Sequence, residues 1–141
     1  MEEGNGISSI TRNRGEAAAN GQFYGGVALV WRESSCSLRK LDYPNPDGFE
    51  VLIAGGKLHG HTRKLVVIAC YLPPGYAKRR GEEALGFING AVVHLKQKFT
   101  DPYIVLAGDF NQWDIEEALL DFPDLKAVSY THLTLPTIYS V

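Results

Sequence analysis

The chain has 141 residues, with 14 Lys and Arg against 16 Asp and Glu, and a formal net charge of −2. Hydrophobic residues make up 45% and charged residues 21%, which is ordinary for a globular domain and excludes a disordered tail, a collagen-like chain and a disulfide scaffold. A chain of this length builds one hydrophobic core rather than two, and its near-neutral charge excludes a generally basic protein that wraps nucleic acid.

No segment predicts insertion into a membrane or export across one. The longest apolar runs, such as residues 65–72, are far shorter than the roughly 18 residues of a membrane helix. The first residues, Met-Glu-Glu-Gly, are acidic and contain no apolar stretch, so the sequence predicts no secretory signal. We therefore expect an intracellular protein, in the cytoplasm or the nucleus, without a membrane partner.

The first part of the chain predicts short strands. Residues 8–11 are expected to form one within a polar segment. Residues 25–31, Gly-Gly-Val-Ala-Leu-Val-Trp, are an apolar run opened by glycines, which predicts a strand buried on both faces. Residues 37–41 are expected to pair with it.

Two further strands, residues 49–54 and 64–71, are predicted to form a hairpin. The stretch 65–70 has no polar alternation, so it is expected at the centre of a sheet, and the paired prolines that follow end it. The tip of this hairpin is expected to be extended and to contain Gly55, Gly56, His59, Gly60 and His61.

The cysteines and histidines predict no metal site. Cys36 and Cys70 fit no metal or redox spacing, so both are expected to be reduced thiols, with Cys70 in a buried strand. His59 and His61 lie two residues apart but lack a third ligand, which disfavours a metal site there. The metal ligands therefore stay unassigned.

The hydrophobic period changes after the prolines. Over residues 82–99, large apolar side chains recur at spacings of three and four, which predicts an amphipathic helix. Residues 103–107 predict another buried strand. A second helix is expected to begin at Asp114, where Glu117 completes an acidic relative of the capping box. The stripe of the first helix consists of Leu85, Ile88, Val92, Leu95 and Phe99.

The end of the chain differs in composition from the rest. Residues 128–141 contain no Asp, Glu, Lys or Arg, whereas the preceding 127 residues contain all 30. The order Val-Ser-Tyr-Thr-His-Leu-Thr-Leu-Pro-Thr at 128–137 resembles a transposon-derived sequencing adaptor translated in one frame. We therefore expect two parts: residues 1–127, a partial domain, and residues 128–141, a non-native tail without a role in function.

The strongest chemical signal is Gly108-Asp109-Phe110-Asn111, which follows an apolar strand. Side chains alternate along a strand, so Asp109 and Asn111 are expected on one face and Phe110 in the core, while Gly108 permits a close approach by another chain or by a substrate. A carboxylate can orient or deprotonate a water molecule, and an amide can donate to a developing charge, which suits phosphate-ester hydrolysis. An Asx turn that ends the strand is the alternative.

Two other features accompany this motif. Tyr71 ends a second buried strand, and its phenol can donate a hydrogen bond to a phosphoryl oxygen; an aromatic side chain packed on the following prolines is the alternative. The basic run Lys78, Arg79 and Arg80 comes soon after it and is a candidate for phosphate contacts in nucleic acid, with a solvated loop as the alternative.

Taken in order, these features resemble a known group of enzymes. The Gly-Gly-Val-Ala segment at 25–28, the Tyr-x-Pro-Pro strand end at Tyr71, an amphipathic helix and Gly-Asp-Phe-Asn are similar to the endonuclease/exonuclease/phosphatase superfamily, above all to the endonuclease domain of LINE-type (non-LTR) retrotransposons. The resemblance covers residues 12–128. It implies an α/β (α+β) fold, a deoxyribonuclease I-like sandwich of two sheets flanked by helices.

The resemblance also implies an activity. Relatives hydrolyse phosphate esters with a divalent cation, usually Mg²⁺, and the retrotransposon domain nicks DNA. By position, Tyr71 matches the active-site tyrosine, Asp109 the aspartate that aligns the nucleophile, and Asn111 its asparagine partner. Two readings stay open beside a DNA endonuclease: a phosphatase of the same superfamily that acts on phospholipid or inositol phosphate, and a non-catalytic nucleic-acid-binding remnant.

Departures from the family pattern lie at both ends. The family's Asn and metal-binding Glu precede the Gly-Gly-Val-Ala strand, and residues 1–24 contain no convincing equivalents. The closing Asp–His pair would lie beyond residue 127. We therefore expect a domain incomplete at both ends and a fragment that is inactive or nearly so, because members of a catalytic unit act together.

Overall fold

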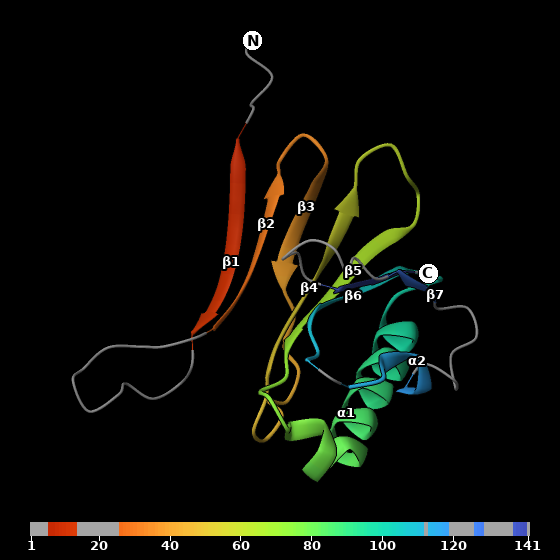
Figure 1. The fold of residues 1–141 in the computed structure, drawn as a ribbon. Coiled ribbons are helices and arrows are strands. Elements are labelled where there is room, and N and C mark those ends of the chain that lie inside the picture. Colours follow the sequence, from red (N-terminus) through yellow and green to blue (C-terminus); the bar gives the residue numbers. More distant parts are fainter. Residues whose placement is uncertain (1–5, 14–25, 112, 119–125, 129–136, 141) are drawn as a thin grey trace, which may run out of the picture.

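The computed structural model describes residues 6–13, 26–111, 113–118, 126–128 and 137–140, which form two sheets and a long helix (Figure 1). This mixed α/β arrangement confirms the predicted fold class. The elements, in chain order, are β1 (Ile7–Asn13), β2 (Gly26–Arg32), β3 (Cys36–Lys40), β4 (Glu50–Leu58), β5 (Lys64–Tyr71), α1 (Tyr76–Lys98), β6 (Tyr103–Asp109), α2 (Ile115–Ala118), β7 (Lys126–Val128) and β8 (Thr137–Ser140).

The first two strands form a small antiparallel sheet of their own. Side chains in β2 alternate between exposed and half-buried, and Val30 is 66% exposed. The prediction of a strand buried on both faces is therefore wrong, because β2 packs on β4 and β5 with one face only. Its predicted pairing with residues 37–41 is also wrong, since β3 pairs with β4 instead.

The large sheet has the strand order β3-β4-β5-β6-β8-β7. The predicted hairpin of β4 and β5 is confirmed, and the pairing of β5 with β6 is parallel. Gly55 and Gly56 were expected in the hairpin tip, but they belong to β4, so this expectation is wrong. The physical reason is close strand contact: a Cβ atom at Gly56 would lie 1.9 Å from the carbonyl oxygen of Ser37 in β3.

Helix α1 connects β5 to β6 and covers one face of the large sheet (Figure 1). The predicted stripe is confirmed, because Ile88, Val92 and Leu95 are almost fully buried in the core. The helix begins at Tyr76, six residues before the predicted start. Arg80 has non-helical angles (φ −140°, ψ 31°) that kink α1, so the predicted start at residue 82 lies just after the kink.

The opposite face of the large sheet lies against β1 and β2. Leu52 and Ala69 are Cα partners in β4 and β5 and are 1% and 5% exposed, yet they lie outside the core cluster that contains α1. β2 contacts both of these strands. The described elements thus stack as helix, large sheet and small sheet, which confirms the predicted sandwich.

The segments near the C-terminus add short elements. The backbone N–H of Glu117 donates to Oδ1 of Asp114 at 3.4 Å, as expected for a helix that begins at Asp114. Strand β8, within the predicted tail, pairs with β6 and β7; residues 129–136 and 141 lie outside the described residues. The non-native origin of residues 128–141 stays a prediction.

Among the helices that the structure describes, none is both long and apolar enough to cross a membrane. Cys36 and Cys70 are free and buried, as predicted.

Candidate active site

Tyr71 and Asp109 end two neighbouring parallel strands, β5 and β6, and are Cα partners in the ladder between them. Neighbouring strands lie about 4.8 Å apart, and paired residues share a face. The backbone N–H of Leu72 donates to the carbonyl oxygen of Asp109 at 2.9 Å, which extends the pairing past the strand ends. Tyr71 is half-buried and Asp109 is exposed, so the ladder places a residue with a phenol beside a residue with a carboxylate at the rim of the sheet.

Gly108 makes this close strand contact possible. Its φ angle is +151°, and a Cβ atom there would lie 1.9 Å from the carbonyl oxygen of Cys70. No side chain fits at such a distance. The expected role of Gly108, a close approach by another part of the chain, is therefore confirmed.

The turn after β6 has both features that the sequence offered as alternatives. Asp109 and Asn111 are exposed while Phe110 is 3% exposed, as predicted, although β6 ends at Asp109 and strand alternation does not extend to Asn111. The backbone N–H of Asn111 also donates to Oδ1 of Asp109 at 2.9 Å, which is an Asx turn. One carboxylate oxygen of Asp109, Oδ1, thus fixes the turn, and the residue is exposed.

Asn111 ties this turn to the end of β5. Its side-chain nitrogen, Nδ2, donates a hydrogen bond to the carbonyl oxygen of Leu72, and its backbone is left-handed, with a φ angle of +51°. Asparagine tolerates this conformation better than most residues. The amide that was expected to donate to a substrate thus uses one N–H within the protein and keeps a second.

Two charged residues near this rim have no counterpart in the sequence prediction. Glu50 is the Cα partner of Tyr71, so Glu50, Tyr71 and Asp109 form one row across three strands. Glu50 is 8% exposed, the one buried charged residue among those described. From β1, Nη1 of Arg12 donates to the carbonyl oxygen of Val51 at 2.7 Å. A Glu at the start of an apolar strand is a weak sequence signal for a functional residue. Nothing in the sequence indicates that Arg12 of β1 contacts this end of β4.

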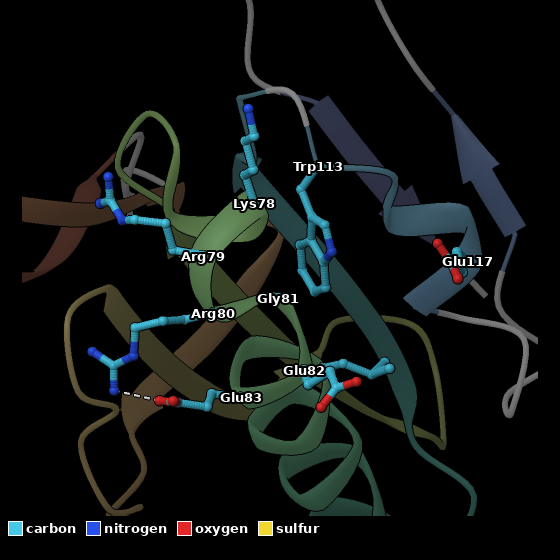
Figure 2. A pocket seen from close by; sticks show the side chains of 9 residues that line it. Lys78, Arg79, Arg80, Gly81, Glu82, Glu83, Trp113 and Glu117 are labelled. Carbon is cyan, nitrogen blue, oxygen red and sulfur yellow. Dashed lines mark hydrogen bonds and ion pairs between the residues drawn. The ribbon is translucent and has the colours of Figure 1, made fainter.

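The predicted basic run lines a cavity of about 510 Å³ beside these strand ends (Figure 2). We call this cavity the helix-start pocket. Trp113 forms part of its wall, although no pattern in the sequence indicates a role for this residue. The lining residues are Lys78, Arg79, Arg80, Gly81, Glu82, Glu83, Leu85, Trp113 and Glu117.

The three basic residues are not equivalent. Arg80 forms ion pairs with Asp47 at 3.0 Å and with Glu83, and hydrogen bonds to these carboxylates raise the pKa of its guanidinium. Its charge is therefore compensated within the protein. Lys78 and Arg79 are exposed, which leaves them as the cations of the run that can meet a phosphate.

In the part of the chain that the structure describes, no three His, Cys, Asp or Glu side chains converge to hold a metal ion. His59 contacts the carbonyl oxygen of Ser34 at 2.9 Å, whereas the ring of His61 packs on Tyr103. The described residues therefore assign no ligand to a metal ion.

The chain shares its fold with structures of the endonuclease/exonuclease/phosphatase group. The chain is 15% identical to a protein of that family from Bacteroides thetaiotaomicron, with a TM-score of 0.65. The alignment covers 96% of this chain and 59% of the other. With the human Nocturnin catalytic domain with bound sulfate the chain shares 13% identity and a TM-score of 0.64, and the alignment covers 96% of this chain and 60% of the other. With the Bacteroides thetaiotaomicron mannosyl-6-phosphatase Bt3783 it shares 14% identity and a TM-score of 0.63, and the alignment covers 96% of this chain and 62% of the other.

These similarities establish the predicted deoxyribonuclease I-like fold. No protein-family model and no curated protein matches the sequence. The chain spans about 60% of the length of the solved structures that it resembles.

Proposed function

We propose that this chain is part of a phosphodiesterase that hydrolyses DNA, of the kind found in LINE-type retrotransposons. The observation that carries the proposal is the pairing of Tyr71 with Asp109 at the ends of β5 and β6, with Asn111 bound across the same strand ends. These residues come from separate parts of the sequence and meet at one rim. The shared fold, found in hydrolases of phosphate esters, supports the same chemistry.

The proposed reaction is attack of a water molecule on phosphorus. Asp109 orients the water through Oδ2 and accepts its proton, since Oδ1 is held by the Asx turn. The Tyr71 phenol donates a hydrogen bond to a non-bridging phosphoryl oxygen and stabilises its growing negative charge. The P–O bond to the leaving strand then breaks, and the leaving oxygen keeps the bonding electron pair and takes a proton from solvent. Mg²⁺ dependence is part of the proposal, without ligands assigned in this chain.

Plasmid nicking tests the proposal. We expect slow conversion of supercoiled DNA to the open circle with excess protein and Mg²⁺, because the proposed partial domain lacks family residues at both ends. Asp109→Ala is expected to abolish this residual activity, and Tyr71→Phe to lower it by about 10²-fold, in the range of one lost transition-state donor. Lys57→Ala, remote from the rim on β4, is the matched control.

Other outcomes separate the alternatives. Phosphate release from an inositol phosphate that depends on Asp109, without nicking, would favour the phosphatase. Salt-sensitive DNA binding that Asp109→Ala leaves intact, with no cleavage of either substrate, would favour a binding remnant. Nicking as fast as that of complete nucleases would contradict the proposed partial domain.

A further inference from the structure

The geometry points to the helix-start pocket as a binding site for one unpaired nucleobase of the DNA strand, next to the phosphate held at Asp109. This inference rests on the proposed function and adds a recognition element to it. The pocket has a volume of about 510 Å³, which lies in the range of sites for small molecules.

Trp113 offers the surface for such a base. Its indole extends into the pocket between Lys78 and Glu82 (Figure 2). The ring lies 6.1 Å from that of buried Phe110, centroid to centroid, so the core supports it from behind. Gly81 lines the pocket beside the edge of the indole, where a Cβ atom would lie 3.8 Å from the indole nitrogen. An aromatic side chain that is partly exposed and held in place is a platform for base stacking.

The charges of the pocket fit a nucleotide better than a bare phosphate. With Arg80 compensated by Asp47 and Glu83, the pocket contains the cations Lys78 and Arg79 and the carboxylates Glu82 and Glu117. Carboxylates repel phosphate but accept hydrogen bonds from the amino groups of adenine and cytosine. We therefore place the phosphate near the cations and the base between Trp113 and Glu82.

The pocket is joined to the proposed hydrolytic site by a short, hydrogen-bonded turn. The backbone N–H of Trp113 donates to the carbonyl oxygen of Phe110 at 3.0 Å, and Asn111 in the same turn is bound to Leu72. A base on Trp113 would thus lie at a fixed place relative to Asp109. An unpaired base beside the scissile phosphate would be selected over a stacked one.

Fluorescence binding tests the inference independently of catalysis. In Asp109→Ala chains that also carry Trp31→Phe, Trp113 is the remaining tryptophan. We expect a short single-stranded oligonucleotide to quench its emission and an abasic oligonucleotide of equal length to quench it little and to bind about tenfold more weakly. Glu82→Gln is expected to reduce the preference for adenine and cytosine over thymine.

Three variants keep the result interpretable. Binding itself is measured by anisotropy of a labelled oligonucleotide. Trp113→Ala should remove the tenfold preference for the base-containing strand, whereas Trp113→Phe should retain most of it. Gly81→Leu, which adds a side chain to the pocket beside the indole and leaves residue 113 unchanged, should remove it as well. Equal affinity for base-containing and abasic strands, or a preference that survives both Trp113→Ala and Gly81→Leu, would overturn the inference.

The inference and the proposed function can fail separately. If nicking depends on Asp109 but this preference is absent, the inference fails alone. If the preference is present without nicking, the hydrolytic proposal fails instead.

Discussion

The side-chain amide of Asn111 is bound to the backbone carbonyl oxygen of Leu72, so one hydrogen bond joins the ends of two parallel strands. This bond predicts that Asn111 contributes to stability as well as to the proposed chemistry. Asn111→Gly removes the bond and is expected to lower the free energy of unfolding by about 1 kcal/mol. Urea denaturation of both proteins measures the difference.

Asn111→Ala separates the side-chain bond from the backbone conformation. Because the φ angle of Asn111 is +51°, alanine loses the same hydrogen bond and adds strain of about 1–2 kcal/mol. We expect Asn111→Ala to be less stable than Asn111→Gly by that amount. Equal stability of the two variants would show that the turn relaxes to another conformation.

Two glycines with different surroundings give opposite predictions. Gly108→Ala places a Cβ atom against the Cys70 carbonyl, so the β5–β6 ladder must shift, and we expect a loss of more than about 2 kcal/mol. Gly86→Ala meets open space on α1 and is expected to stabilise the protein by about 0.5–1 kcal/mol. Thermal denaturation followed by circular dichroism compares them. A stable Gly108→Ala variant would contradict the close strand contact.

The buried thiol of Cys70 predicts a loss of stability at alkaline pH. Burial raises the pKa of Cys70 above its usual value of 9.0, so the folded state keeps its proton while the unfolded state releases it. The contribution of the protonated Cys70 thiol to the free energy of unfolding is complete below pH 9. Above pH 9 this contribution is lost at up to about 1.4 kcal/mol per pH unit. Cys70→Ala removes this component. Urea denaturation between pH 8 and 10.5 should therefore show a shallower decline for Cys70→Ala than for the unmodified chain, and parallel declines would argue against a buried thiol.

The three basic residues at the start of α1 should differ in their effects on DNA binding. Lys78→Ala and Arg79→Ala are each expected to reduce the slope of log K against log salt by about 0.9, the effect of one lost phosphate contact. Arg80→Ala should leave that slope unchanged, because Asp47 and Glu83 occupy its guanidinium. Fluorescence anisotropy at several salt concentrations measures the slopes. An equal effect of all three would show that DNA displaces these carboxylates.

Local patterns in the sequence predicted the elements that bury one face. The stripe of α1 follows from side-chain period alone. The burial of Phe110 was predicted from strand alternation, although β6 ends at Asp109 and an Asx turn places Asn111. The partners of β2 and β3 could not be predicted this way. Their pairing depends on which strands meet in space, and adjacent apolar strands in a sequence give no information about a break between two sheets.

The candidate site shows the same division. Tyr71 and Asp109 could be proposed because each ends an apolar strand, but their pairing required the parallel register of β5 and β6. The pairing of Arg80 with Asp47 spans 33 positions in the chain, and nothing local indicates it. Trp113 and Glu50 gain their significance from neighbours on other elements, so residue type alone could not single them out.

Parallel strands require the chain to return along the whole sheet before the second strand can begin. In this protein α1 is that return path, and it brings Leu72 and Asn111 together across 39 positions. All the groups proposed to act on the phosphate therefore come from one uninterrupted stretch, residues 71–111. Recombination or gene fusion that moves this stretch as a block would carry the reacting groups with it, whatever sequences are joined to either end.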